Sequence, residues 1–151
     1  MSIIAHTMQY IGGEMPSPSI ALRRYLDMDY PIYREVYNDC FADMRRALGL
    51  HPVNCCDGKG ILAEKSENIF IFEVDNKLAG SVAIYGNEID DLIVARQYQR
   101  KGYGQGLLRF AVARMQRGGI FPIMLHVADW NRGAIELYTK NGFCIIKTET
   151  V

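Results

Sequence analysis

A glycine-rich segment between an apolar strand and an amphipathic helix carries the residues with the clearest chemical meaning. Gly102, Gly104 and Gly106 fall within five positions, directly after Arg100 and Lys101. Glycines at this spacing let the backbone approach a ligand closely and present successive N–H groups to it. A helix that begins here adds about half a positive charge. The segment therefore predicts an anion site, with phosphate as the natural guest.

Neither common nucleotide-binding motif fits the glycines of this chain. The dinucleotide fingerprint G-x-G-x-x-G, counted from Gly102, needs glycine at position 107, where the sequence has Leu107. A P-loop ending at Gly58 needs glycine at 53 and serine or threonine at 60, but Val53 and Gly60 stand there. A tight strand-to-helix turn without a ligand is the remaining structural explanation of the segment 102–106.

Changes in hydrophobic period predict the elements that position this segment. Strands are predicted at 19–25, 69–74, 78–85, 89–94, 121–127 and 143–148. Helices are predicted for about four turns after a cap at Asp29, at 104–117, and from Asn131 to Gly142. The segment 49–67 is predicted as a loop with at most a short helical piece. The order strand, helix, strand around 104–117 predicts a parallel pair joined by a crossover, and 75–77 predicts a hairpin turn.

This order of elements predicts the fold class α/β, with a central mixed sheet of the α+β kind flanked by helices. A length of 151 residues fits one domain. The stretch 1–18, which ends in two prolines, reads as an extended arm before a domain at 19–151. The first residues lack the pattern of a secretory signal and no window is apolar enough to span a membrane, so we expect a cytoplasmic protein.

Charge and cysteine content argue against several classes of partner. Seventeen basic and seventeen acidic residues cancel, so neither nucleic acid nor a membrane is an expected partner. Residues 1–90 carry thirteen acidic and eight basic side chains, whereas residues 91–151 carry four and nine. The cysteines, at 40, 55, 56 and 144, form no C-x-x-C pair, so we expect reduced, partly buried thiols and no metal.

Two blocks of the sequence resemble the GNAT superfamily of acetyl-coenzyme A-dependent N-acetyltransferases. Residues 99–104, QRKGYG, match the family's [QR]-x-x-G-x-[GA] loop, and residues 125–143 match its later pattern L-x-V-x-x-x-N-x-x-A-x-x-x-Y-x-x-x-G-F. The resemblance covers about 88–143 closely and does not extend to 1–18. It departs from the family at Arg96, where proline is frequent. It implies the GNAT acyl-CoA N-acyltransferase fold.

The resemblance also implies residues that would hold acetyl-coenzyme A as co-substrate. The N–H groups of 102–105 would cradle its pyrophosphate, and the backbone of Leu92 and Val94 would bind its pantetheine arm. Asn131 would contact the arm, although a helix N-cap explains it equally well. The implied cofactor-binding residues are Leu92, Val94, Gln99, Arg100, Lys101, Gly102, Tyr103, Gly104, Gln105 and Asn131.

Three further residues are implied as catalytic. A lysine-like amine has a pKa of about 10.4, and removing its proton at pH 7 costs roughly 4 to 5 kcal/mol. Glu88 stands where some family members carry a glutamate base, and Asp90 is the next candidate. Strict alternation would place both on the face of Leu92. Tyr138 occupies the family position that protonates the departing thiolate, whereas its apolar neighbours alone would suggest a core residue.

The resemblance implies transfer of an acetyl group to a primary amine of a small molecule or peptide by direct attack. A non-catalytic acetyl-coenzyme A sensor of the same fold is the alternative. The acidic residues Asp39, Asp43, Asp57 and Glu64 would favour a cationic acceptor if they face the groove. We assign no catalytic role to His126. Because homodimers are common in the family, a homodimer is a further expectation.

Overall fold

The computed structural model describes residues 2–151, which form one seven-stranded sheet with helices on both faces. The strands are β1 (Ile4–Tyr10), β2 (Arg23–Arg24), β3 (Ile69–Val74), β4 (Lys77–Tyr85), β5 (Glu88–Val94), β6 (Met124–Ala128) and β7 (Phe143–Thr150). The α-helices are α1 (Tyr30–Ala47), α2 (Lys59–Lys65), α3 (Tyr103–Arg117) and α4 (Arg132–Lys140). Single turns of 3-10 helix cover Asp27–Asp29, Ser66–Asn68 and Arg96–Tyr98. The predicted α/β class with a mixed sheet is confirmed.

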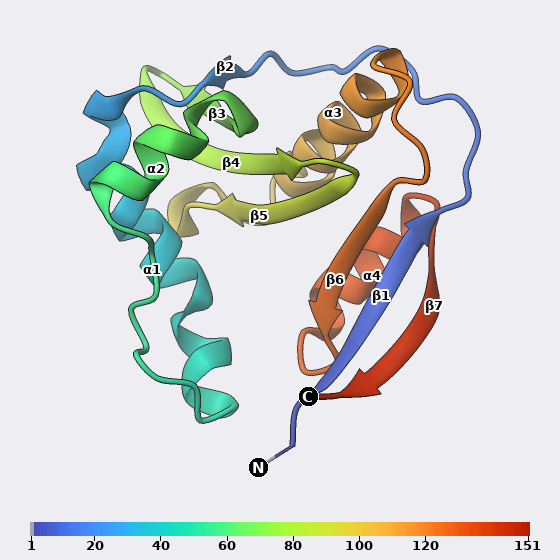
Figure 1. The fold of residues 1–151 in the computed structure, drawn as a ribbon. Helices are drawn as coiled ribbons and strands as arrows, with labels where there is room; N and C mark the ends of the chain where they lie inside the picture. The colour runs from blue at the N-terminus through green and yellow to red at the C-terminus, as the bar shows by residue number, and fades with distance from the viewer. Residues whose placement is uncertain (1) are drawn as a thin grey trace.

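The strands follow the order β2-β3-β4-β5-β6-β1-β7 across the sheet (Figure 1). Neighbours are antiparallel except β5 and β6, which run parallel. The predicted crossover through α3 is therefore confirmed, because only a parallel pair needs one. The predicted hairpin also forms, with Asp75 and Asn76 in the turn between β3 and β4 at positive φ of 51° and 63°.

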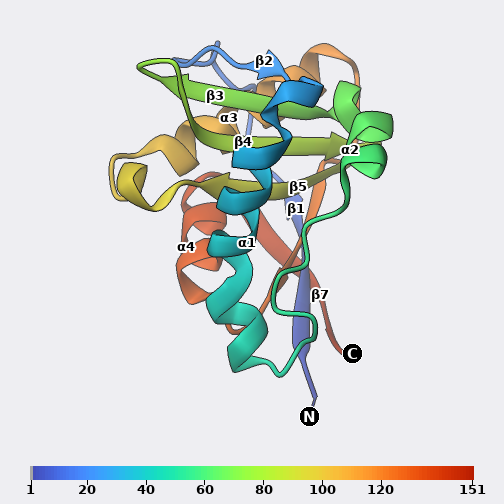
Figure 2. The same ribbon diagram turned by 90° about the vertical axis from the view of Figure 1, so that its left-hand side faces the viewer.

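Two hydrophobic clusters lie on opposite faces of the sheet. Helices α3 and α4 pack on one face, around buried residues such as Leu107 and Leu125. Helices α1 and α2 pack on the other, around residues such as Tyr33 and Ile93. Figure 2 shows α1 in front of the strands with α3 behind them. Covering both faces explains why β4 is buried over most of its length.

The N-terminal segment corrects the prediction of an arm over 1–18. Residues Ile4–Tyr10 form β1, which lies inside the sheet between β6 and β7. Met8 in this strand is fully buried in the α3 side of the core. Met1 lies outside the described residues. Residues 11–22, which include the prolines at 16 and 18, belong to no strand or helix and carry the chain past α3 to β2 (Figure 1).

Several predicted boundaries shift for local reasons. The strand predicted at 19–25 shrinks to Arg23–Arg24. The strand predicted at 121–127 begins only at Met124, after Pro122, which has no N–H to donate. Asp29 is the N-cap residue of α1, as predicted, but its side chain makes no capping hydrogen bond. Its carboxylate accepts hydrogen bonds from the Arg23 guanidinium and the Leu26 N–H, each at 2.8 Å.

Helix α1 is longer than predicted, with 18 residues. The loop predicted at 49–67 contains the short helix α2 near its end. Within residues 2–151, no helix is long and apolar enough to cross a membrane.

Candidate active site

Strands β5 and β6 pair only at their beginnings and then separate. Their register contains Glu88 opposite Met124 and Ile89 opposite Leu125, whereas β5 continues to Val94 and β6 to Ala128. Figure 1 shows the two strands diverging, with α4 beside β6 and α1 beside β5. The parallel pair therefore opens a wedge in the middle of the sheet, and the side chains at its walls define the candidate site.

A bulge in β5 at the start of the wedge changes which side chains face which helix. Asp91 has a positive φ of 48°, and the pairing with β4 shifts register beside it. Ile89 and Leu92 consequently both pack on the α3 side, although they are three residues apart. The predicted alternation is wrong here, because Glu88 and Asp90 lie on the α1 face while Leu92 and Val94 lie on the α3 face.

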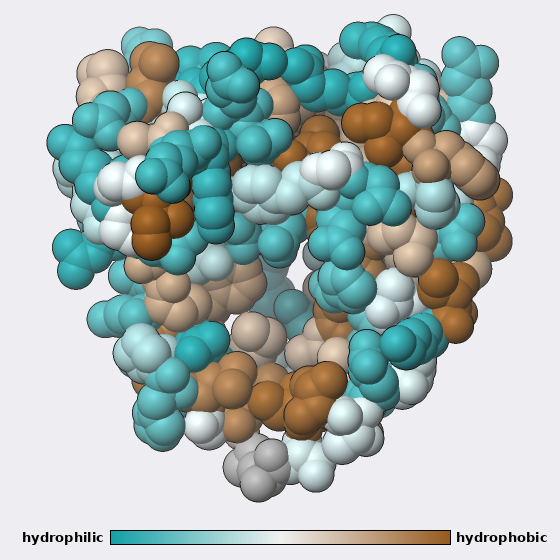
Figure 3. Space-filling view, viewed as in Figure 1, coloured by the Kyte–Doolittle hydropathy of each residue, from teal (hydrophilic) through white to brown (hydrophobic). Residues whose placement is uncertain are grey.

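The wedge holds two adjoining chambers that share Leu92, Ala134 and Leu137 as walls. The first, of about 450 Å³, lies at the start of α3 and is lined by residues 92–94, 98–100 and 102–104. The second, of about 300 Å³, lies between α1, β5, β6 and α4. The space-filling view shows a hollow between the two halves of the molecule at this level (Figure 3).

The start of α3 supplies unpaired N–H donors to the first chamber. Gly102 precedes the helix in a left-handed conformation, with φ of 84°, which glycine adopts without steric cost. The N–H groups of residues 103–105 have no backbone or side-chain acceptor among residues 2–151, as expected for a first helical turn. Arg100 and Lys101 beside it are exposed and form no ion pair within the described chain. These features fit a phosphate-bearing ligand.

At the end of β5, the backbone carbonyl that lines this chamber is hydrogen-bonded to two side chains of the protein itself. The carbonyl of Val94 accepts hydrogen bonds from the Gln99 amide at 3.0 Å and from the Cys40 thiol at 3.2 Å. Burial raises the pKa of the Cys40 thiol to about 11, so this cysteine stays protonated at neutral pH. Gln99, one of the predicted binding residues, therefore shapes the turn toward α3.

Two adjacent carboxylates and a tyrosine line the second chamber. Asp90 is exposed, whereas the bulge turns Asp91 toward α1, where it accepts a 3.0 Å hydrogen bond from the Tyr37 hydroxyl. Burial, reinforced by the charge of Asp90, raises the pKa of Asp91 to about 6. A carboxylate that titrates this close to neutrality can take up a proton under working conditions.

Tyr138 reaches the same chamber from α4. Burial, with a smaller contribution from the charge of Asp90, raises the pKa of Tyr138 to about 12, so its hydroxyl is protonated at any working pH. Asn131 also lines the chamber and accepts a 3.2 Å hydrogen bond from the Ala134 N–H as the N-cap of α4. The capping explanation of Asn131 is thus confirmed, and the residue also lies in the wall of the cleft.

Glu88 does not stand free in the chamber. Its Oε1 lies 2.9 Å from Nε2 of His126, and Nδ1 of that ring lies 3.1 Å from the Thr7 hydroxyl. Since an ionised carboxylate only accepts, Nε2 of His126 donates to Glu88, and Nδ1 is engaged by the Thr7 hydroxyl. The chain of hydrogen bonds links β5, β6 and β1 where β5 and β6 begin to separate, and it leaves the ring without a free nitrogen.

Most of the predicted residues thus meet at one cleft. Glu88, Lys101 and Gln105 are not among the residues that line either chamber. The four acidic residues expected to attract the acceptor, Asp39, Asp43, Asp57 and Glu64, do not line the chambers either. Three of them form ion pairs, Asp39 with Arg96, Asp43 with Arg46 and Asp57 with Lys65. Asp91 is not among the predicted site residues. Two consecutive aspartates inside an apolar strand were the available signal of a bulge.

Comparison with known proteins places the chain among acetyltransferases. Residues 22–143 match the description "Acetyltransferase (GNAT) family". Streptothricin acetyltransferase A of Bacillus subtilis (strain 168) is 29% identical over 93 residues, covering 58% of this chain and 54% of that protein. The chloroplastic GCN5-related N-acetyltransferase 6 of Arabidopsis thaliana is 40% identical over 60 residues, covering 40% of this chain and 21% of that protein. The chain thus spans about half of the first relative and a fifth of the second.

Solved structures share the fold. A putative acetyltransferase from the GNAT family of Novosphingobium aromaticivorans superposes with a TM-score of 0.70 at 20% identity, covering 99% of this chain and 63% of that one. The PaiA N-acetyltransferase of Thermoplasma acidophilum, solved in complex with coenzyme A, superposes with a TM-score of 0.68 at 21% identity, covering 82% and 88%.

Proposed function

Because the chain belongs to the acetyltransferase (GNAT) family, we propose that it transfers an acetyl group from acetyl-coenzyme A to a cationic primary amine. One observation carries this proposal. The wedge between β5 and β6 joins a chamber with unpaired helix N–H groups to a chamber with two carboxylates, Asp90 and Asp91. An anionic donor and a cationic acceptor would meet at the shared wall.

The first chamber would hold the donor. Its pyrophosphate would lie against the N–H groups of residues 102–105, with Arg100 and Lys101 adding charge at the edge, and its arm would follow Leu92 and Val94 towards Asn131. The donor supplies a thioester, whose carbonyl is activated toward an amine. The protein supplies the alignment of the two reactants, which is a large share of catalysis in transfers of this kind.

A carboxylate in the second chamber would remove the proton from the acceptor amine. An ammonium cannot attack a carbonyl, so a base must lie beside the amine. The predicted candidates were Glu88 and Asp90, and the geometry adds Asp91. We favour Asp91, because Glu88 is engaged by His126 and Asp90 is exposed, whereas the pKa of Asp91 is raised by burial to about 6.

Tyr138 would supply a proton to the leaving thiolate from the opposite wall. Its raised pKa of about 12 makes it a weaker acid than free tyrosine, whose pKa is about 10. Transfer would therefore need the sulfur to carry nearly full negative charge. The hydroxyl would also stabilise that charge by hydrogen bonding before the proton moves.

The acceptor would be drawn in by negative charge. Asp90 and Asp91 face the chamber beside aromatic and thioether side chains of α1, Phe41 and Met44. A relative named streptothricin acetyltransferase A is consistent with an amine-bearing small molecule as acceptor.

Thermal unfolding with and without acetyl-coenzyme A, with NAD as the control nucleotide, tests the donor site. Ligand at 100 times its Kd adds about 2.7 kcal/mol to the stability of the folded state. A rise in Tm with acetyl-coenzyme A alone supports the proposal, and no rise at saturating ligand contradicts it. Release of free coenzyme A thiol over a panel of primary amines then tests transfer. Binding without thiol release from any amine would favour the sensor.

A further inference from the structure

A second groove lies on the α3 side of the sheet, at the opposite end of α3 from the glycine turn. Its volume is about 640 Å³, and none of its walls belongs to either chamber of the cleft. The walls come from β2, β3, β4, the second half of α3 and the crossing segment at Pro18. Along α3, Arg114 in this groove lies ten residues, about 15 Å, from Gly104 in the donor chamber. This groove takes no part in the proposed acetyl transfer.

The floor of the groove is aromatic and aliphatic. Phe70 and Phe110 pack with ring centroids 5.4 Å apart, beside Ile84 and Met115. Phe70, Ile84 and Met115 are buried, whereas Phe110 is partly exposed to the groove. Because Phe70 is buried and Arg114 lies over its ring, Phe110 is the ring of this floor that a flat apolar group can contact.

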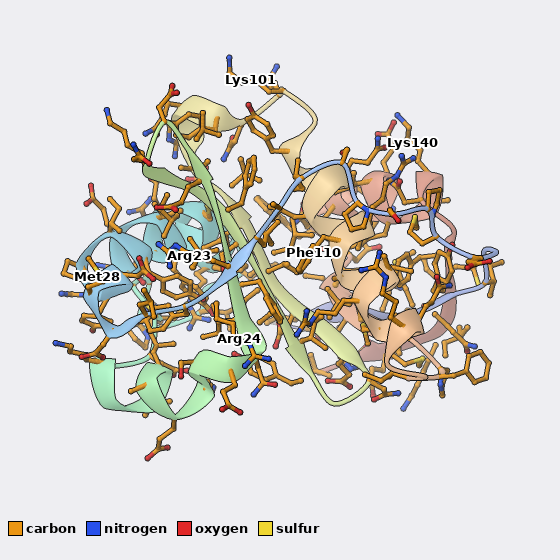
Figure 4. All side chains as sticks on the ribbon, turned by 90° about the horizontal axis from the view of Figure 1, so that it is seen from above. Arg23, Arg24, Met28, Lys101, Phe110 and Lys140 are labelled. Carbon is orange, nitrogen blue, oxygen red and sulfur yellow. The ribbon has the colours of Figure 1, made fainter. Side chains whose placement is uncertain are left out.

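Three arginines from two segments lie around this floor. Arg24 comes from β2, and Arg114 and Arg117 come from the last turns of α3. Within residues 2–151 none of the three forms an ion pair with a carboxylate, and Glu67 is the one acidic residue in the walls. Figure 4 views this side from above and labels Arg24 and Phe110.

Arg24 is placed here by strand alternation. Its neighbour Arg23 turns to the other face, where it binds Asp29 and Glu73. Successive side chains of a strand point to opposite faces, so Arg24 is carried toward α3. The negative end of the α3 dipole explains why Arg114 and Arg117 lie in its last turn. It does not explain why Arg24 comes to the same groove from β2.

Arg114 is held in a form suited to binding an anion. Its guanidinium lies 4.6 Å from the centroid of the Phe70 ring. The N–H donors of this guanidinium have no acceptor within residues 2–151, and their fork matches a carboxylate. An arginine held against a ring also loses less side-chain freedom when it binds.

We propose that this groove is a binding site for a small aromatic carboxylate, with the ring against the partly exposed Phe110 and the carboxylate between Arg24 and Arg114. The site is independent of the acetyl-transfer cleft.

Isothermal titration of the full chain with 2-naphthoate tests the proposal, with the neutral 2-naphthylmethanol as matched probe. We expect saturable binding of the acid and at least tenfold weaker binding of the alcohol. Arg24→Gln and Arg114→Gln should each weaken 2-naphthoate binding at least tenfold, and Phe110→Ala should weaken both probes. Lys140→Gln removes one exposed charge outside the groove and should leave binding unchanged.

Four results would overturn the proposal. The first two are no saturable binding of 2-naphthoate and equal affinity for the acid and the alcohol. The third is a loss of 2-naphthoate affinity in Lys140→Gln as large as in the arginine variants. The fourth is displacement of 2-naphthoate by acetyl-coenzyme A, which would place the probe in the cleft. Arg24, Arg114 and Lys140 are exposed, so we expect their variants to fold normally. The melting temperature of each variant checks this.

Discussion

The hydroxyl of Tyr37 donates a 3.0 Å hydrogen bond to the carboxylate of Asp91, and so joins α1 to the bulge of β5. The contact lies where β5 leaves β6, so the carboxylate is turned away from the α3 face and into the chamber on the α1 side. Burial and the charge of Asp90 raise the pKa of Asp91 to about 6, while the hydrogen bond from Tyr37 opposes this shift by favouring the charged form. A raised pKa is the property that a proton acceptor needs near neutral pH.

Asp91→Asn should lower the rate of acetyl transfer by about 100-fold or more, the usual contribution of a positioned base. The measurement is release of coenzyme A thiol against pH. In the unaltered protein the rate should fall as the pH drops through about 6, where Asp91 becomes protonated, and this limb should vanish in the variant. Asp75→Asn, in the exposed β3–β4 turn, is the matched control. An unchanged rate and pH profile in Asp91→Asn would remove this residue from the reaction.

The same substitution should make the protein more stable at neutral pH. The folded-state pKa of Asp91 lies above its ordinary value of 3.8, so the folded protein binds the proton more tightly than the unfolded chain does. The stabilising contribution is therefore complete below pH 3.8 and is lost as the pH rises through about 6. Asn has no charge to bury, and urea unfolding at pH 7 should show a gain of about 1–3 kcal/mol. A loss of stability would mean that the buried charge is better accommodated than this pKa implies.

The bulge shows why the site was only partly predictable. The motif around Gly102 and the position of Tyr138 follow from sequence spacing, because a helix start and a short helix preserve local order. The face of the sheet on which Glu88, Asp90 and Leu92 lie cannot be predicted in this way, because one left-handed residue, Asp91, shifts the alternation of every residue after it. Asp91 becomes a site residue only through contact with Tyr37, 54 positions earlier in the chain, and sequence periodicity carries no information about such a contact.

Tyr138→Phe should reduce turnover while leaving the affinity for acetyl-coenzyme A intact. The ring packs against Phe143, with centroids 6.1 Å apart, and phenylalanine preserves that packing. The lost hydroxyl should cost about 10-fold or more in kcat, as for other positioned proton donors. Thiol release gives kcat, and titration calorimetry gives the affinity. A variant as active as the parent would exclude Tyr138 as the proton source.

Gly104→Val should weaken acetyl-coenzyme A binding by narrowing the first chamber. A Cβ at this position lies 3.6 Å from Leu137 and 4.0 Å from Leu92 and Val94, so the two further methyl groups must enter the space between α3, β5 and α4. Gly60→Val is the control, because a Cβ at Gly60 meets nothing within 4 Å. Calorimetric titration should show at least a tenfold rise in Kd for Gly104→Val and no change for Gly60→Val. Equal affinity in both variants would contradict the assignment of this chamber to the donor.

The N-terminal strand illustrates a different limit of sequence reasoning. Residues 4–10 hold polar side chains among apolar ones, and two prolines separate them from the rest of the chain. Nothing local indicates that this segment fills a gap between β6 and β7, strands formed more than 110 residues later. The partners of His6, which are Thr148 at 2.8 Å and Asp129 at 2.7 Å, become visible only in the folded chain.

Substitution of Met8 measures how strongly this strand is built into the domain. Met8 is fully buried between β6 and β7 on the α3 side, whereas Met28 is 81% exposed. Truncating a buried methionine to alanine removes apolar contacts and leaves a cavity, which costs about 2–5 kcal/mol. Met8→Ala should therefore lower the free energy of unfolding by that amount in urea, while Met28→Ala should change it by less than about 0.5 kcal/mol. If both variants unfold at the urea concentration of the parent, residues 4–10 contribute little to the core and behave as an arm after all.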